Sequence, residues 1–216
     1  MSDKVRDYSG DAVSITYDAT RCIHAAECIR GLPAVFDTKR RRWIDPSAAG
    51  AAAITEVVMR CPTGALHATR RDGGPDEPTP ARNVVTVSSN GPLYVRGELE
   101  IETSAGTIHE TRAALCRCGA SKRRPFCDGS HQDIGFRDDG QLELGKPIAP
   151  PQTDRDGPLL VRASHRGPLL FGGVLEIRSG DERTWARLQH PALCRCGHSR
   201  RKPFCDATHQ QIGFDG

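Results

Sequence analysis

The sequence is poor in aromatic residues and has no long apolar run. Phe, Trp and Tyr together make up 5% of its 216 residues, whereas Gly and Pro number 22 and 15. So few large side chains make a large conventional core improbable on physical grounds, and small units stabilised by metal are one answer to that shortage. No stretch stays apolar for long enough to span a bilayer, so we expect no membrane-spanning helix.

A secretory signal is also missing, because no apolar segment follows the charged start MSDKVRDYSGD. The nine cysteines are an odd number, which does not suit the paired framework of a secreted disulfide-rich protein. The formal net charge of +3 is too small to indicate a nucleic-acid partner. We therefore expect a soluble, cytoplasmic protein with reduced thiols that binds neither nucleic acid nor membrane.

Two nearly identical strings dominate the rest of the chain. CRCGASKRRPFCDGSH and CRCGHSRRKPFCDATH are related by a constant offset, since 194−116 and 209−131 both equal 78. Each string offers three thiols and one imidazole, and four such side chains within one short string, repeated in register, indicate two metal sites. The candidate ligands are Cys116, Cys118, Cys127 and His131 in the first copy, and Cys194, Cys196, Cys205 and His209 in the second.

The spacing of these ligands favours two irons over a single zinc ion. Structural zinc sites usually open with C-x2-C, whereas the first pair here is C-x-C. One intervening residue in an extended segment sends Cys116 and Cys118 to the same face, which suits two thiolates on one iron. Asp128 is a good helix N-cap, so a first helical turn would aim Cys127 and His131 toward a second iron. The pattern predicts a [2Fe–2S] core, with a zinc-stabilised binding module as an alternative.

The replacement of one thiolate by His has a chemical consequence. Three thiolates and a neutral imidazole bring an oxidised [2Fe–2S] site to a charge of about −1, against about −2 for four thiolates. A less negative site accepts an electron more easily, as in Rieske centres. Because an unperturbed His titrates near pH 6.5, protons compete with iron for the ring nitrogen. We expect redox chemistry coupled to protons, and clusters that are labile in acid.

The signature C-x-C-x2-S-x3-P-x-C-D-G-S-H, from Cys116 to His131, resembles that of the CDGSH iron–sulfur family of mitoNEET-like proteins. The second copy keeps every ligand but has Ala207 and Thr208 where the first has Gly and Ser. The resemblance implies [2Fe–2S] clusters with a solvent-facing His ligand, and roles in electron or cluster transfer rather than catalysis. Members of this family pair two such units across a dimer, so we expect the tandem copies to form an internal pseudo-dimer in a monomeric protein.

A third set of cysteines lies near the N-terminus. Cys22 and Cys28 form C-x5-C, Cys61 begins a Cys-Pro pair, and Ala25 stands where bacterial ferredoxins place a middle cysteine. With the neighbouring Leu-Pro, Val-Phe-Asp and Trp-Ile segments, this pattern resembles the divergent single-cluster ferredoxin family over most of residues 13–68.

The missing fourth cysteine leaves the type of this cluster open. The resemblance implies either a [3Fe–4S] cluster on Cys22, Cys28 and Cys61, or a [4Fe–4S] cluster whose open iron takes water or a side chain. His24 is a candidate for that side chain, although a lone His in such a loop is more often a polar surface residue. Buried free thiols without iron are the remaining alternative.

Two stretches rich in Pro, Gly and charge divide the chain, and both are typical of linkers. Alternating apolar residues at 13–17 predict a strand, and the apolar face of 48–60 predicts a helix. The expected fold class is α+β: a small ferredoxin-like domain followed by two small β-rich CDGSH units. The expected boundaries are a ferredoxin-like domain at 1–70, a linker at 71–82, CDGSH unit 1 at 83–144, a linker at 145–157 and CDGSH unit 2 at 158–216.

Basic residues accompany both cysteine strings. They would offset the negative charge of the thiolates and steer an acidic redox partner. A solvated cationic face is an equally good interpretation. The residues concerned are Arg112, Arg117, Lys122, Arg123 and Arg124 in the first copy, and Arg183, Arg187, Arg195, Arg200, Arg201 and Lys202 in the second.

We find no nucleophile–base pair, phosphate loop or nucleotide fingerprint, so we do not expect an enzyme. The expected function is electron transfer by two [2Fe–2S] clusters and one [3Fe–4S] or [4Fe–4S] cluster, with redox proteins as partners. The alternative is storage of clusters and their delivery to apo-acceptors, with His131 and His209 as release points.

Overall fold

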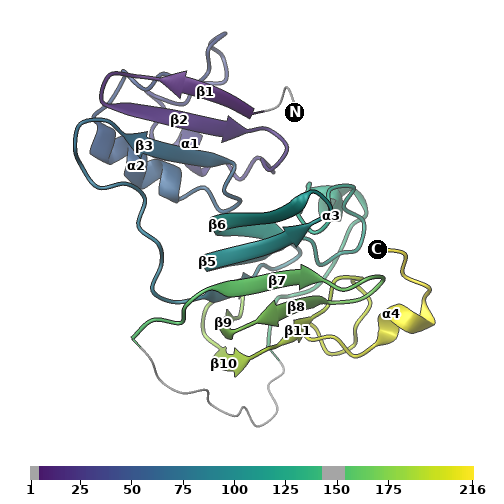
Figure 1. The fold of residues 1–216 in the computed structure, drawn as a ribbon. Coiled ribbons are helices and arrows are strands. Elements are labelled where there is room, and N and C mark those ends of the chain that lie inside the picture. Colours follow the sequence, from purple (N-terminus) through teal and green to yellow (C-terminus); the bar gives the residue numbers. More distant parts are fainter. Residues whose placement is uncertain (1–4, 143–153) are drawn as a thin grey trace. The chain divides into compact units, whose positions relative to one another are not determined.

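The structure is a computed structural model that describes residues 5–142 and 154–216 (Figure 1). Most of the linker expected at 145–157 lies outside the described residues. The chain divides into two compact units, Met1–Pro78 and Thr79–Gly216, and each is described by itself. Both cysteine repeats belong to the second unit.

The first unit is a three-stranded antiparallel sheet, in the order β1-β2-β3, combined with two helices. The strand predicted at 13–17 is confirmed as β2. The helix predicted at 48–60 is confirmed with a later start, because Gly50 is extended (φ −66°, ψ 145°) and serves as its N-cap. The elements are β1 (Val5–Ser9), β2 (Val13–Asp18), α1 (Glu27–Gly31), α2 (Ala51–Met59) and β3 (Leu66–Arg70).

The core of the first unit joins the sheet to α2. Ile15 on β2 and Ile54 and Val58 on α2 are fully buried in one apolar cluster, together with Phe36 and Ile44 from the connecting segment. Burying an aliphatic side chain of this size stabilises a fold by about 1.5–3 kcal/mol. This packing holds the end of β2 and the end of α2 in place, and the cysteine segments follow directly from those two ends.

The second unit is built on one eight-stranded sheet with the order β10-β9-β4-β5-β7-β8-β11, and β6 pairs with β5. Alternate residues along the long strand β5, such as Leu93, Val95 and Ile101, are buried, which matches the two-residue period of a strand with one face on a core. The strands are β4 (Val84–Val87), β5 (Leu93–Thr103), β6 (Gly106–Leu115), β7 (Leu159–Ala163), β8 (Leu169–Gly172), β9 (Val174–Arg178), β10 (Trp185–Gln189) and β11 (Ala192–Leu193).

The two sequence copies interleave within this sheet. The first strand of each copy pairs in parallel with a later strand of the other copy, so that Val84 lies opposite Glu176 and Leu160 opposite Glu100. The strand segments of the copies are offset by 76 positions, and 84+76=160 while 100+76=176. The two parallel pairings are therefore equivalent: each joins the first strand of one copy to the same later position of the other copy.

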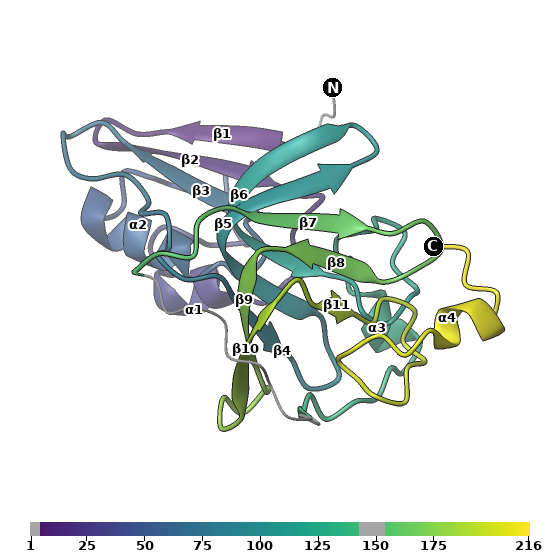
Figure 2. The ribbon, with the colours of Figure 1, turned by 60° about the horizontal axis from the view of Figure 1, so that its bottom comes forward.

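Each copy ends in a short helix that carries its candidate histidine ligand. These helices are α3 (Ser130–Asp133) and α4 (Thr208–Gln211). Two views related by a 60° turn show both helices at the same end of the second unit's sheet (Figures 1 and 2). In the described part of the chain, no helix combines the length and the apolar character needed to cross a membrane.

Candidate metal centres

The first two cysteines of copy one follow directly from the last residue of β6. The Sγ atoms of Cys116 and Cys118 lie 3.8 Å apart in a buried position. Two thiolates bonded to one tetrahedral ion at about 2.3 Å are separated by about 3.8 Å. The C-x-C pair therefore has the spacing needed to hold one metal ion, as its sequence predicts.

The other two ligands of copy one form a second pair. Sγ of Cys127 lies 3.3 Å from Nδ1 of His131, one helical turn away. A short ladder places this pair beside the first, since the N–H of Cys116 donates to Pro125 O (2.8 Å) and that of Cys127 to Ala114 O (2.9 Å). Site one is thus two close ligand pairs brought together by backbone hydrogen bonds.

Asp128 organises this loop differently from the prediction. The N-cap of α3 is Gly129, at a left-handed φ of 93°, so the prediction that Asp128 caps the helix is wrong. Its carboxylate instead accepts hydrogen bonds from the backbone N–H of Lys122 (2.8 Å) and from the N–H and hydroxyl of Ser130 (3.0 and 2.6 Å). Burial opposes ionisation, but these donors prevail and lower the pKa of Asp128 to about 2. Asp128 therefore clamps the two halves of the loop together.

Copy two repeats this geometry. Cys194 Sγ lies 3.7 Å from Cys196 Sγ, and Cys205 Sγ lies 3.4 Å from His209 Nδ1. Ala207 adopts the left-handed conformation, with a φ of 67°, at the position that Gly129 occupies in copy one. The substitutions in the second string therefore preserve the turn and both ligand pairs, which we call site two.

Burial governs the protonation of the ligands before metal binds. It raises the pKa of the Cys127 thiol to about 11, and it also raises the pKa of Cys205. It lowers the pKa of His131, which favours the neutral imidazole that ligates metals. A cation must therefore displace protons from these two thiols on binding, whereas a hydrogen bond with Cys118 lowers the pKa of Cys116 to about 6. Across the described residues, no group of three or more Cys, His, Asp or Glu side chains is close enough to hold a single metal ion.

The two cysteine loops touch each other. A Cβ placed on Gly119 would lie 2.7 Å from the carbonyl oxygen of Cys196, and one on Gly197 would lie 2.7 Å from that of Cys118. Both glycines have a φ of 83°, which L side chains rarely adopt. Only glycine allows the two loops to approach so closely, and the contact is reciprocal.

Two arginines between the paired cysteines are buried, which sequence reasoning missed. Arg117 and Arg195 are 2% and 3% exposed. They lie 5.1 Å and 5.2 Å over the rings of Phe136 and Phe214, and each ring packs in one apolar cluster with the first two cysteines of its own copy. A solvated cationic face therefore does not describe these two residues. Their identical place within both C-x-C motifs is the signal that could have revealed them.

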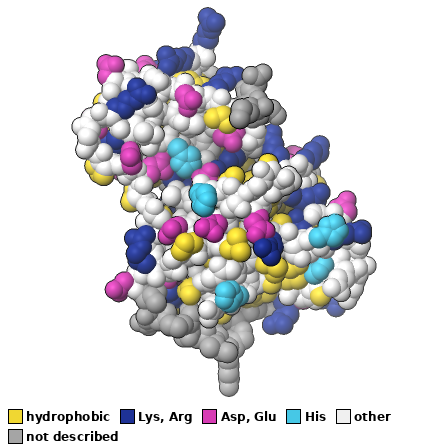
Figure 3. Space-filling view, in the orientation of Figure 1, with side chains coloured by type: hydrophobic (Ala, Val, Ile, Leu, Met, Phe, Trp, Pro, Cys, Tyr) yellow, Lys and Arg dark blue, Asp and Glu magenta, His cyan; other side chains and the backbone are white. Residues whose placement is uncertain are grey.

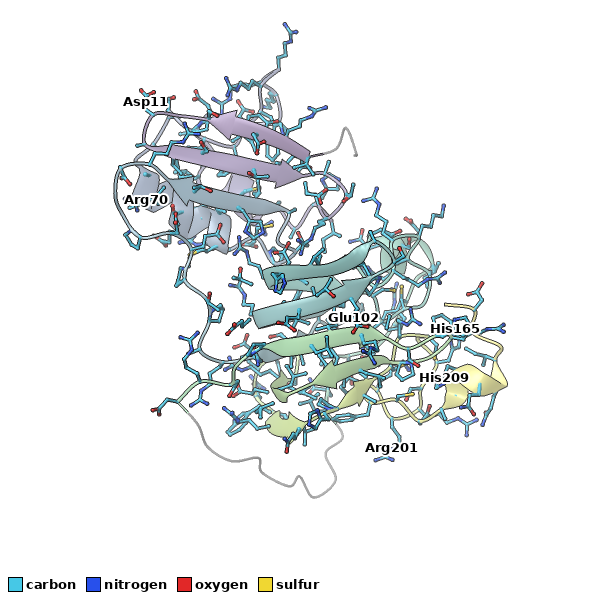
Figure 4. All side chains as sticks on the ribbon, viewed as in Figure 1. Asp11, Arg70, Glu102, His165, Arg201 and His209 are labelled. Carbon is cyan, nitrogen blue, oxygen red and sulfur yellow. The ribbon has the colours of Figure 1, made fainter. Side chains whose placement is uncertain are left out.

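Other basic side chains of the strings remain on the surface. Lys122, Arg123, Arg200 and Arg201 are exposed. The space-filling view shows Lys, Arg and His side chains gathered at the end of the second unit that carries α4 (Figure 3). His165 and His209 lie at this end as well, with Arg201 on the neighbouring loop (Figure 4).

The three cysteines of the first unit converge on one cavity. Cys22, Cys28 and Cys61 all line it, and so does Ala25, the residue at the position of the absent cysteine. His24 is exposed and lines a neighbouring hollow with Cys22 and Cys28, but it does not line the three-thiol cavity. Cys22 comes from the loop after β2, Cys28 from α1 and Cys61 from the segment after α2.

Aromatic packing and burial shape this cavity. Tyr17 and Trp43 line it and meet edge to face at 4.9 Å. The pKa of the Cys28 thiol is raised to about 11, mainly by burial and secondly by the charge of the neighbouring Cys61. Burial and a hydrogen bond with Cys22 raise the pKa of Tyr17. Like the other sites, this one needs a cation to deprotonate its thiols.

Comparisons with known proteins agree with the two kinds of site. A family model described as "Divergent 4Fe-4S mono-cluster" matches residues 8–71, and one described as "Iron-binding zinc finger CDGSH type" matches residues 90–132 and 166–210. The uncharacterized protein YjdI of Escherichia coli K12 is 34% identical over 61 residues, which are 28% of this chain and 80% of that protein. YjdI of Escherichia coli O157:H7 matches to the same extent. No solved structure matches the chain.

All nine cysteines of the chain are free: six of them lie in the close ligand pairs of the second unit, and the other three line the cavity of the first. These side chains suit the 4Fe-4S cluster that one family model names and the iron binding that the other names. Over residues 8–71 the chain therefore belongs to the divergent 4Fe-4S mono-cluster family, and it carries two tandem copies of the CDGSH motif after that domain.

Proposed function

We propose that this protein transfers electrons through three iron–sulfur clusters. Site one and site two would each hold a [2Fe–2S] cluster on three thiolates and one imidazole. The observation that carries this proposal is the division of each ligand set into two pairs, with separations of 3.8 and 3.3 Å in site one. Each pair suits one ion, and two pairs side by side suit two irons better than a single zinc.

The cluster of the first unit would be [3Fe–4S], or [4Fe–4S] with one iron free of cysteine. Three thiols around one cavity, with Ala25 in its wall, support this assignment. The exposed position of His24 outside that cavity favours its interpretation as a surface residue. Electron paramagnetic resonance of the oxidised protein tests the assignment, because an oxidised [3Fe–4S] centre is paramagnetic whereas [4Fe–4S]2+ is silent.

The two CDGSH copies would act as an internal pseudo-dimer. Their equivalent parallel strand pairings and the reciprocal contact of their loops support this arrangement. The second unit would then need no further subunit to complete its pair of sites. Light scattering should give the mass of a monomer, and an obligate dimer would contradict the proposal.

The decisive experiment asks whether iron and sulfide are bound and redox-active. The purified protein should be red-brown, contain acid-labile sulfide, and lose its visible absorption on reduction with dithionite. A colourless protein that contains zinc would contradict the proposal. The red-brown protein should also exchange electrons with a flavoprotein reductase faster than it loses any iron.

Delivery of clusters to apo-acceptors is a second candidate function. It is favoured by the accessibility of site two, where Cys205 and His209 are half-buried while Cys127 and His131 are 3% and 7% exposed. Replacing His131 by Cys removes the ring nitrogen for which protons compete and should slow the loss of cluster one in acid. An unchanged rate of loss would remove the release mechanism. Transfer to an apo-ferredoxin faster than reduction by the flavoprotein would favour delivery.

In either case we propose acidic redox proteins or apo-acceptors as partners, in the cytoplasm, with no catalytic turnover by the protein alone. The exposed basic side chains of the two cysteine loops support an acidic partner, because opposite charges steer association. The initial rate of electron transfer should fall as salt is added. A rate independent of ionic strength would contradict steering.

A further inference from the structure

The buried arginine of site one is neutralised by a carboxylate. The guanidinium of Arg117 donates to Asp138, whose side chain is 13% exposed, and to two backbone carbonyls. The backbone of Asp138 is itself held in place by Asn90, which accepts from its N–H at 2.9 Å and donates to its carbonyl at 2.7 Å. Lys202 approaches the same carboxylate to 3.9 Å. Site one thus has an ion pair directly beside the ring that packs on its cysteines.

The corresponding arginine of site two has no such partner in the described part of the chain. The guanidinium of Arg195 donates to two backbone carbonyls at 2.9 and 2.7 Å, and among the described residues no carboxylate lies within 4.0 Å of it. The position equivalent to Asp138 is Gly216, since 138+78=216. A second guanidinium, that of Arg124, lies 5.8 Å over the same ring of Phe214. The carboxylate of Asp215 lies 3.9 Å from the guanidinium of Arg124, but the Asp215 side chain is 80% exposed, so water screens its negative charge.

Site two is also the more open of the two sites. Beside its histidine ligand lies a surface hollow of about 390 Å³ lined by His165, Arg166, His209, Gln210, Gly213 and Phe214. His165 and Arg166 stand where copy one has Ser89 and Asn90, since 89+76=165 and 90+76=166. Copy one uses Asn90 to fasten Asp138, whereas copy two places two basic side chains at the hollow. Water and positive charge therefore both reach site two.

We propose that the two CDGSH sites are unequal, that the second holds an electron more strongly than the first, and that Asp138 sets this order by neutralising Arg117. The inference rests on the proposed electron-transfer function. When a site is reduced, one Fe3+ becomes Fe2+ and the site gains one negative charge. An uncompensated buried cation and contact with water both stabilise added negative charge, and both are stronger at site two. Electrons arriving at the pair collect at site two.

Reduction of the full-length holoprotein in steps with dithionite tests this order. Electron paramagnetic resonance follows the reduced [2Fe–2S] signals, with dithionite as the source of each electron. With one electron supplied per pair of sites, we expect at least a tenfold preference for site two, which is about 59 mV for a one-electron couple. His209→Cys should shift the signal reduced first, and His131→Cys the signal reduced second. Equal potentials, or the opposite assignment, would overturn the inference.

Asp138→Asn tests the residue held responsible. It keeps the shape of the side chain and removes its charge, so site one should become easier to reduce and the preference for site two should shrink. Asp139→Asn is the matched control, because Asp139 is the exposed neighbour and bonds only locally. An Asp138→Asn protein with an unchanged gap would contradict the role of this residue.

A second variant covers the case in which Asp138→Asn does not fold. Arg195→Gln removes the uncompensated charge and should make site two harder to reduce, again narrowing the gap; a gap that stays the same would count against the inference. A protein that takes up no electrons at either site would refute the proposed function as well. Uptake at both sites without a difference would refute the ordering alone.

Discussion

The three-thiol site and the CDGSH sites are assembled in opposite ways. Cys22 and Cys61 are 61−22=39 positions apart, whereas the ligands of site one span only 131−116=15. The three-thiol cavity therefore exists only when the first unit has folded and brought the ends of β2 and α2 together. A CDGSH loop holds its ligands largely by its own hydrogen bonds, such as those to Asp128, and the rest of the fold brings two such loops into contact. Four predictions test this difference.

The largest effect should come from matched cavities in the two cores. Ile54 on α2 and Ile101 on β5 are both fully buried. Truncation of a buried Ile to Ala costs about 2–5 kcal/mol. Ile54→Ala should weaken the N-terminal cluster while the CDGSH absorption persists, and Ile101→Ala should do the reverse. Thermal unfolding followed by cluster-specific absorption measures both, and the loss of all three clusters together in either variant would show that the units are not independent.

A somewhat smaller effect should follow from Asp156, which joins parts of both CDGSH copies. Its carboxylate is 1% exposed and accepts from the N–H of Asn83 at 2.8 Å and from Arg187 at 2.6 Å. Asp156→Ala leaves these donors without a charged partner, which costs about 2–3 kcal/mol. Urea unfolding should show this loss in the second unit. Asp139→Ala, at an exposed site, should stay within about 0.5 kcal/mol of the wild type.

The same carboxylate predicts a pH dependence. Burial opposes ionisation of Asp156, but the hydrogen bonds from Asn83 and the two arginines outweigh it, so its pKa is lowered from 3.8. Because the folded-state pKa is the lower one, the stabilisation is fully present above pH 3.8 and disappears as the pH falls through the folded-state value. The apoprotein should therefore lose stability in acid more steeply than Asp156→Asn. Parallel curves of unfolding free energy against pH for the two proteins would contradict the role given to Asp156.

The smallest predicted effect separates the contact between the loops from backbone strain. Gly119→Ala places an alanine in a left-handed conformation and a Cβ against Cys196, so it should lower the free energy of unfolding by about 1–3 kcal/mol. Gly129→Ala should be destabilised only by the left-handed conformation, because nothing lies within 4 Å of its Cβ and copy two already has Ala207 at that position. Equal losses of stability, measured by urea unfolding, would show that the contact between the loops contributes nothing.

Local features were predictable to the extent that they depend on local spacing. The pairing of Cys127 with His131 follows from a single helical turn, and the common face of Cys116 and Cys118 from one intervening residue. The role of Asp128 was misjudged, because the left-handed Gly129 shifts the start of the helix and turns the carboxylate toward Lys122. A cap prediction cannot foresee a partner that depends on how the loop closes.

The sequence by itself determined the ligand types, their spacing, the duplication, and hence the family to which the chain belongs. Only the tertiary structure decided that strands of the two copies pair with each other and that Gly119 and Gly197 meet the opposite loop. It also decided that Arg117 pairs with Asp138, whereas Arg195 meets no carboxylate among the described residues. The physical reason is the distance along the sequence between the residues on which each feature depends. Ligand pairs depend on neighbours a few residues away, whereas burial and charge compensation depend on which distant segments the folded sheet brings together.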